Sequence, residues 1–398
     1  MSNSEKLSHG ASRRVQRRVN LLNTYSQLST EPQTISEIAS SIAVSRPAVE
    51  AIIADLDSLG WISQLPPDNA FGRPATRWAL NPSVIHVLGL DIGAHHCTAV
   101  VADLAGTVHG ENTQSLQQDL PATDRLAAAT AVGKTALKQA QLTYDDITLI
   151  CVASPGAIDA GTVTYFGGNG MPGWEGTNIT NGIASLTGCA TLAAGDCALG
   201  ALGESWLGAA AGHADVVYLL SGQRTGAAAI IDGHVHHGHL GSAGLIGELN
   251  PLHWKDIESS EFSRGAYGQP NPDRERIFLD AKNGDAIAQQ AVETFADYLS
   301  LGAAAMVLAL GPSHLVIGGT YSAYSELFLD RFTAQLSRWC PVMPEVSVSA
   351  LGRHAISLGA VRYGLDSLTQ SLNAFVRSSD IFPSVEGFRA LYRPHSHK

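Results

Sequence analysis

Apolar residues recur at helical spacing through the first sixty residues and predict three helices. The first helix covers residues 14–28, where apolar side chains stand three or four positions apart. A capping box, Thr34 to Glu37, starts a short second helix over residues 35–41. Ser45 is a suitable N-cap for a third helix, which ends near Leu59 before a glycine. This order of a helix, a short helix, a tight turn and a longer helix predicts a helix-turn-helix.

Two short strand-like segments follow the helices and predict a hairpin, the wing of a winged helix-turn-helix. They cover residues 61–62 and 76–80, and turn-forming residues that include Gly72-Arg73-Pro74 connect them. A Gly-Arg-Pro tip is extended and narrow, so its cation can enter a minor groove. The first turn of the third helix is expected in the major groove, as in other helix-turn-helix proteins.

The residues predicted to contact DNA are Ser45, Arg46, Pro47, Glu50, Arg73 and Arg77. Each arginine taken singly fits a solvated surface residue better than a DNA contact. Pro47 lies in a first helical turn that needs no backbone donor, so it supports the predicted helix start. The ordered combination of capping box, Ser-Arg-Pro helix start and arginine-tipped wing favours DNA binding.

Beyond Pro82 the pattern changes to strands that alternate with helices, which is typical of α/β folds. Strands are predicted at residues 85–90, 98–103, 107–109 and 147–152, with a helix over residues 125–141. A second unit of the same kind begins near Ala214, and two similar halves imply two lobes with a cleft between them. The expected divisions are a winged helix-turn-helix domain at residues 1–82, a first α/β lobe at 83–195 plus about 365–381, a second α/β lobe at 196–364 and a surface tail at 382–398.

Composition indicates a soluble, globular and cytoplasmic protein. Of the 398 residues, 45% are hydrophobic and 15% are charged, and we expect no apolar run of about 18 residues that could span a bilayer. The first residues lack the apolar core of a secretion signal, so export is not expected. The five cysteines are scattered without a Cys-x-x-Cys pair, which argues against a disulfide framework and a zinc-thiolate site.

The charge is unevenly distributed between the N-terminal head (residues 1–82) and the rest of the chain, the body. Through Asn81 there are eight Lys and Arg against seven Asp and Glu, whereas the remaining residues carry 17 basic and 29 acidic side chains. A near-neutral head with clustered arginines on an acidic body suits a protein that contacts DNA only through its head.

A set of short motifs along the chain resembles the repressor/open reading frame/kinase (ROK) family, which contains sugar kinases and winged-helix, sugar-responsive repressors. The resemblance covers the head and the body to about residue 370. The motifs that carry it are Asp91-Ile92-Gly93, Pro155-Gly156, residues 169–174, Gly195-Asp196, residues 200–204, Asp232-Gly233, residues 243–248 and residues 316–319. The resemblance implies a two-lobed actin-like (ribonuclease-H-like) ATPase fold behind a winged helix-turn-helix.

Two loops that hold ATP phosphates in the family's kinases are altered in this chain. The first reads Asp-Ile-Gly-Gly-Thr in those kinases, and Ala94 and His95 occupy its last two places here. The second is rich in glycine, whereas this chain carries Gln223 and Arg224. Glycine lets the backbone approach a phosphate closely, and bulky side chains obstruct that approach. The resemblance therefore implies that ATP binding and kinase activity are absent.

The resemblance aligns Asp196 with the general base of the family's kinases, the carboxylate that takes a proton from a sugar hydroxyl. Asp196 could instead cap the helix that follows it, and the sequence leaves both roles open. The family's other sugar contacts are only partly kept, which implies an altered effector. The positions expected to contact a ligand are Gly156, Asn169, Asp196 and Glu248.

Many members of the family have a structural zinc site of one histidine and several cysteines, and the resemblance implies its loss here. Glu248 replaces the histidine, and residues 250–268 contain no cysteine. Four histidines between His234 and His239 lie in a predicted hairpin loop without carboxylate or thiolate ligands at matching spacing. We expect these to be solvated loop histidines, and we expect no metal or other cofactor.

These observations favour a DNA-binding transcriptional regulator, in particular a repressor, controlled by a sugar or sugar-derived effector in a degenerate kinase-like cleft. The expected partners are double-stranded operator DNA, a small-molecule effector and further copies of the chain in a homodimer or homotetramer. One alternative is a sugar kinase with Asp196 as its general base. A second is a DNA-binding regulator that has lost its effector.

Overall fold

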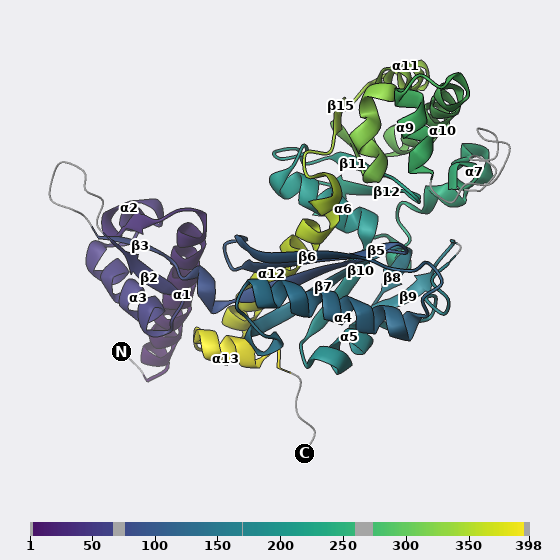
Figure 1. The fold of residues 1–398 in the computed structure, drawn as a ribbon. Coiled ribbons are helices and arrows are strands. Elements are labelled where there is room, and N and C mark those ends of the chain that lie inside the picture. The colour runs from purple at the N-terminus through teal and green to yellow at the C-terminus, as the bar shows by residue number, and fades with distance from the viewer. Residues whose placement is uncertain (1–2, 67–75, 169, 259–273, 394–398) are drawn as a thin grey trace.

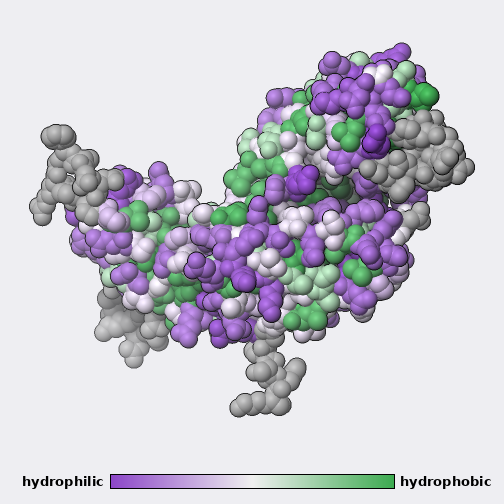
Figure 2. Space-filling view, in the orientation of Figure 1, coloured by the Kyte–Doolittle hydropathy of each residue, from purple (hydrophilic) through white to green (hydrophobic). Residues whose placement is uncertain are grey.

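The computed structural model describes residues 3–66, 76–168, 170–258 and 274–393. A small N-terminal head is followed by two larger lobes, each built on a five-stranded sheet (Figure 1). On the face shown in Figure 2, hydrophilic and apolar residues are interspersed over the head and both lobes. The mixed α/β body confirms the fold class expected from the alternation of strands and helices.

The head consists of three helices and a small antiparallel sheet. Its helices are α1 (Asn3–Thr30), α2 (Ile35–Ser41) and α3 (Arg46–Ser58), and its strands are β1 (Gln33–Thr34), β3 (Arg77–Leu80) and β2 (Ile62–Leu65), in that spatial order. α1 begins well before residue 14, where the sequence analysis placed its start. The pattern did not predict this first part, because the mostly polar residues ahead of Val15 show no apolar period. The capping box is confirmed, since Thr34 and Glu37 each accept a hydrogen bond from the other's backbone N–H.

The turn into α3 follows the prediction in position but not in every contact. Ser45 stands at the N-cap, yet its side chain makes no capping hydrogen bond. The Ser45 carbonyl accepts from the N–H groups of Ala48 and Val49, and Pro47 occupies the first turn. The helix start therefore depends on the backbone and on proline, and the serine hydroxyl remains exposed.

The first lobe is a five-stranded sheet between α4 and α5 on one face and a long C-terminal helix on the other. Its strands, in spatial order, are β10 (Thr191–Gly195), β7 (Ile147–Ser154), β4 (His86–Ile92), β5 (His96–Asp103) and β6 (Val108–Ser115). β4 and β7 are parallel and almost wholly buried, which explains their unbroken apolar runs. Covering one face are α4 (Ala122–Gln139) and α5 (Ile179–Thr187), and the hairpin of β8 (Ala157–Asp159) and β9 (Thr162–Tyr165) follows β7.

The second lobe repeats this plan with a second five-stranded sheet. Its strands, in spatial order, are β13 (His234–Val235), β12 (Thr225–Ile231), β11 (Val216–Ser221), β14 (His314–Gly318) and β15 (Glu345–Val348). One face packs against α9 (Glu275–Lys282), α10 (Ala286–Leu310) and α11 (Leu329–Trp339). The other face packs against α6 (Asp196–Leu207), which connects the two lobes.

α6 packs tightly against α12 (Ala355–Ser378) between the two sheets (Figure 1). The contact needs small residues, because a β-carbon on Gly359 would lie only 1.7 Å from the Leu199 carbonyl oxygen. α12 then runs along β4, where a β-carbon on Gly89 would lie 2.6 Å from the Ser357 carbonyl oxygen. The chain thus contacts the first sheet again from Ser357 onward, earlier than the expected return near residue 365.

α10 is the longest apolar helix of the body, and it bears on the expectation that no apolar run of about 18 residues is present. Among the described residues it is the one helix long and apolar enough to span a membrane by length and composition. Glu293 and Asp297 interrupt its apolar residues, so the helix contains no unbroken apolar run of that length. Just over half of its most apolar stretch is buried within the second lobe, as in the core helix of a globular protein.

The head is joined to the body by an aromatic cluster at the end of the chain. Trp61, which follows α3, is fully buried and donates its indole N–H to the Pro383 carbonyl at 2.7 Å. Its ring contacts Phe382 and Phe388, with ring centroids 6.2 and 5.6 Å apart. Tyr25 of α1 packs edge-on against the same indole. One continuous hydrophobic core therefore runs from the head through these residues to the first sheet.

This cluster corrects the expected surface tail at residues 382–398. Residues 385–390 form a short helix, α13 (Val385–Ala390), and the Val385 N–H donates to the Leu59 carbonyl at the end of α3. Phe388 is 1% exposed. The pattern did not reveal this because two aromatic residues in a short segment show no period, and residues 394–398 lie outside the described part.

Replacing Phe388 with alanine should destabilise the fold by about 3–5 kcal/mol, because it removes a buried ring and leaves a cavity beside Trp61. Urea unfolding monitored by tryptophan fluorescence measures the change. Leu391→Ala is the matched control, since Leu391 is 57% exposed and near the same chain end. Equal stability of Phe388→Ala and Leu391→Ala would contradict the junction.

Candidate functional site

A cavity lies between the two lobes, and three of the four predicted ligand positions line it. Gly156 comes from the first lobe, Asp196 from the start of α6 and Glu248 from a short 3-10 helix (Leu245–Glu248) of the second lobe. The surface is hollowed where the lobes meet (Figure 2). Asn169, the fourth position, lies outside the described residues.

Gly156 shapes the cavity wall through its backbone. Its φ of +97° is in the region that favours glycine, and a β-carbon would lie 2.3 Å from the Tyr165 carbonyl oxygen. The glycine thus lets the turn after β7 approach the β9 strand closely. Its presence is explained by this approach whether or not a ligand contacts it.

Asp196 is the first residue of α6 and also lines the cavity. One of its carboxylate oxygens accepts the Cys197 N–H at 2.7 Å, whereas the N-cap position of α6 is Gly195 and has no side-chain capping bond. Burial, and secondly the negative charge of Asp91, raise the pKa of Asp196 to about 6. A carboxyl group with that pKa can accept or donate a hydrogen bond to a ligand hydroxyl near neutral pH.

Asp91 and His96 are paired with each other near Asp196. The His96 Nε2 lies 3.3 Å from an Asp91 carboxylate oxygen, and this hydrogen bond raises the pKa of His96. Buried Arg125 fixes the neighbouring turn by donating to the carbonyl oxygens of Gly93 and Ala94 at 2.6 and 3.1 Å. The first phosphate-type loop is therefore held by internal partners that sequence motifs did not identify.

Arg224 extends from the second lobe to the first. Its guanidinium lies over the Phe166 ring, 4.2 Å from the ring centroid. It also occupies the space beside Gly168, where a β-carbon would meet it directly. Arg224 therefore contacts the hairpin region of the first lobe across the cavity that it lines.

Glu248 is paired with protein groups at the rim of the cavity. Lys255 forms an ion pair with it, and the Tyr165 hydroxyl donates to its carboxylate. This hydrogen bond is the main reason that the pKa of Tyr165 rises to about 12. Like Arg224, Glu248 connects the two lobes, because Tyr165 ends β9.

Glu258 accepts a hydrogen bond from the backbone of the second loop, the one that carries Gln223 and Arg224. The sequence gave no reason to expect this contact. Glu258 ends α7 (Trp254–Glu258), and its carboxylate accepts the Thr225 N–H at 2.6 Å. Arg274 donates to the Glu258 carbonyl and to both oxygens of Gln223, with the Gln223 side-chain oxygen 2.6 Å from one guanidinium nitrogen. An internal carboxylate and an internal arginine thus hold the loop.

The predicted DNA-contacting residues divide between exposed and structural positions. Ser45, Arg46, Pro47 and Glu50 are all exposed on the first turns of α3. Arg46 and Glu50 form an ion pair at 3.2 Å. Arg77 differs, because its partly buried guanidinium donates to the Pro32 carbonyl and supports the head's own sheet. Arg73 lies outside the described residues.

Comparison with known proteins gives a family model that matches part of the chain, and several relatives. Residues 87–255 match the model described as the ROK family. An uncharacterized protein of Clostridium perfringens is 33% identical over 196 residues, and the match covers 46% of this chain and 65% of that protein. A protein named xylose repressor from Caldicellulosiruptor bescii is 22% identical over 324 residues, covering 73% of this chain and 80% of that protein.

Two further matches are to a glucokinase and to a transcriptional regulator of known structure. A glucokinase of Thermotoga maritima is 24% identical over 252 residues, covering 54% of this chain and 78% of the glucokinase. A crystal structure of a ROK family transcriptional regulator, described as a homolog of the Escherichia coli MLC protein, superposes with a TM-score of 0.70 at 19% identity. It covers 90% of this chain and 98% of that regulator, which shows that the fold is shared.

Replacing Asp196 with asparagine should stabilise the protein above pH 6 and have little effect near pH 4. Between an ordinary aspartate pKa of 3.8 and the folded value of about 6, the folded state keeps a proton that the unfolded chain has lost. Stability therefore falls as pH rises through this window, and asparagine removes that loss, which amounts to roughly 1–3 kcal/mol. Denaturant unfolding at pH 4, 6 and 8 measures it, with exposed Asp119→Asn as control. A stability difference that does not change with pH would contradict the raised pKa.

Proposed function

We propose, from the match of residues 87–255 to the ROK family model, that the chain is a DNA-binding transcriptional repressor controlled by a sugar-type effector. A relative named xylose repressor aligns over 73% of the chain, which supports this class. The regulator is a cytoplasmic homodimer or homotetramer whose paired heads bind a pseudo-palindromic operator.

The observation that carries this proposal is the exposed start of α3 on a head fixed to the body. Ser45, Arg46, Pro47 and Glu50 face solvent, whereas the opposite side of α3, which includes Val49 and Ile52, is buried. In a helix-turn-helix the exposed turns enter the major groove. DNA would compete with Glu50 for the Arg46 guanidinium. Because this ion pair is exposed to solvent, it is weak enough to be exchanged for a contact to DNA.

The effector cleft and the head are connected by packed helices. Asp196 begins α6, α6 packs on α12 through Gly203 and Gly359, and α12 ends in the core that contains Trp61. A ligand that changes the separation of the lobes would therefore move α12 and the heads of an oligomer relative to each other. That is a coupling free energy between two sites, the basis of induction by an effector.

The effector proposed here is rich in hydroxyl groups. Asp196 can accept or donate a hydrogen bond, and Gly156 and Glu248 lie on the same cavity. Arg224 adds a cation, so an acidic sugar derivative also fits. A regulator that has lost its effector is the alternative, and thermal-shift screening of sugars, amino sugars and sugar phosphates separates the two, since a ligand of the folded state raises the melting temperature.

Phosphoryl transfer is not expected of this chain. In this chain the Thr225 N–H, a backbone donor of the second loop, is taken by the Glu258 carboxylate. Arg274 holds the same loop by donating to the Gln223 oxygens. A phosphate would have to displace a carboxylate and enter beside it, which is electrostatically unfavourable. The similarity to a glucokinase supports the alternative that the chain is a sugar kinase. In that case Asp196 would be the general base.

Arg46→Ala should weaken binding to the specific operator by about 10- to 100-fold, because a guanidinium contact to a base is worth about 1–3 kcal/mol. Gel-shift titration at fixed salt against an operator found by genome-wide pull-down measures the effect. Arg338→Ala is the matched control, since Arg338 is exposed on α11 in the second lobe. Operator affinity unchanged by Arg46→Ala would contradict the placement of α3 in the major groove.

The wild-type protein should release no ADP above background in a coupled assay with Mg-ATP and a panel of sugars. The expected reason is the internal occupation of the second loop by Glu258. Glu258→Gln keeps the side-chain size and removes the negative charge, so it is the informative companion variant. Robust turnover by the wild type that Asp196→Asn abolishes would show a kinase and overturn this part of the proposal.

A further inference from the structure

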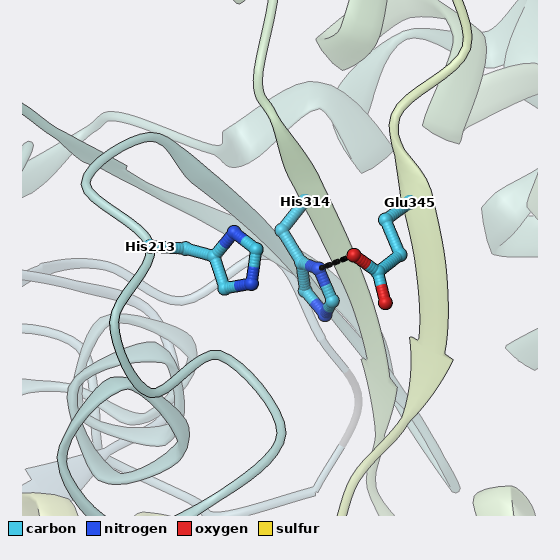
Figure 3. Close-up of side chains that lie close together, drawn as sticks. All are labelled: His213, His314 and Glu345. Carbon is cyan, nitrogen blue, oxygen red and sulfur yellow. Dashed lines mark ion pairs between the residues drawn. The ribbon is translucent and has the colours of Figure 1, made fainter.

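Two histidines and a carboxylate meet where β14 and β15 begin, at the end of the second sheet that lies away from the cavity. His314 begins β14 and Glu345 begins β15, and the two residues pair across the parallel strands. His213 lies in the loop after α6, with its ring centroid 4.3 Å from that of His314. Figure 3 shows the three side chains side by side. The cavity lies beyond the other end of these strands, about 16 Å away for five residues.

His314 is almost completely buried, yet one of its ring nitrogens has no hydrogen-bond partner among the described residues. Its side chain is 2% exposed, and its Nε2 lies 2.8 Å from the Ser347 hydroxyl. Its Nδ1 faces Glu345, whose nearest carboxylate oxygen is 3.7 Å away, too far for a hydrogen bond. A buried polar nitrogen without a partner is costly, and an atom placed between these groups would remove the cost.

We propose that His213, His314 and Glu345 form a binding site for a divalent transition-metal ion, with Zn²⁺ as the best-fitting ion. The candidate ligand atoms of the three residues all lie within 4.8 Å of one another. Two imidazoles and one carboxylate are a common protein ligand set for zinc, with water in the fourth position. Mg²⁺ and Ca²⁺ prefer oxygen ligands and fit less well.

The second shell of the proposed site is already in place. When the His314 Nε2–H donates to Ser347, the Nδ1 lone pair points toward His213 and Glu345, which is the tautomer that a metal needs. Tetrahedral zinc separates its ligand atoms by roughly 3.3 Å, so small side-chain shifts suffice. His213 is only partly buried and Glu345 is exposed, and both can make them.

The backbone holds the three ligand-bearing segments together without the ion. The Ser313 N–H donates to the Asp215 carbonyl, and the Glu345 N–H donates to the Ser313 carbonyl, each at 3.0 Å. The ion therefore meets a largely preformed site. Its proposed role is structural, because it would fix the loop that leaves α6 against the start of β14 and β15. The site is distinct from the histidines of the 234–239 loop.

The test is Zn²⁺ binding to the full-length protein after removal of metal by a chelator and dialysis. Isothermal titration should show one tight site per chain, and Zn²⁺ should raise the melting temperature. His213→Asn and Glu345→Gln should each weaken that site at least tenfold, and Ser347→Ala about tenfold through the second shell. His239→Asn is the matched control, an exposed histidine of the other loop, and should bind as the wild type does.

His213 and Glu345 are chosen because neither is fully buried, so their variants should fold and melt like the wild type without metal. Co²⁺ substituted into the wild type gives an independent measurement, since its visible spectrum should report a nitrogen- and oxygen-bound tetrahedral ion that His213→Asn loses. Absence of a stoichiometric zinc site would overturn the proposal. So would zinc affinity unchanged in both His213→Asn and Glu345→Gln, or a site lost only in His239→Asn.

Discussion

Burial of Trp61 beneath the last residues of the chain is the contact on which the arrangement of this molecule depends. The indole joins α1 and the end of α3 to Phe382 and Phe388, and its N–H is satisfied by the Pro383 carbonyl. Aromatic contacts of this kind bury large areas and fix ring orientation. The head is therefore not a freely tethered module, and the direction in which α3 faces is set by the body.

Because the head is fixed to the body, contacts inside the cleft can affect the position of the head. Arg224 over Phe166, and Glu248 with Tyr165, connect the lobes directly, whereas α6 and α12 connect them through close helix packing at Gly359. A ligand that alters the contacts of Arg224 and Glu248 across the cleft must strain or shift the packing of α6 against α12. Because packed interfaces change between discrete arrangements more readily than they deform continuously, such a shift can reach the head with little loss.

The sequence predicted the parts of this structure that repeat a local pattern. The capping box at Thr34, the buried stripe of α3 and the paired strands of the first lobe each leave a period or a motif. It missed contacts between residues far apart, such as Glu258 with Thr225 and Phe388 with Trp61, because single residues from unrelated segments carry no shared signal. The cavity residues Gly156, Asp196 and Glu248 were found through family motifs, and their internal partners were not.

The dependence of the head on the chain end also has a consequence during protein synthesis. Trp61 and Pro383 are 322 residues apart, so at about 5–20 residues per second the ribosome needs roughly 16–65 s after making the tryptophan to supply its partners. Until then the head lacks part of its hydrophobic core. A product released early would carry the exposed start of α3 without the residues that fix its orientation relative to the body.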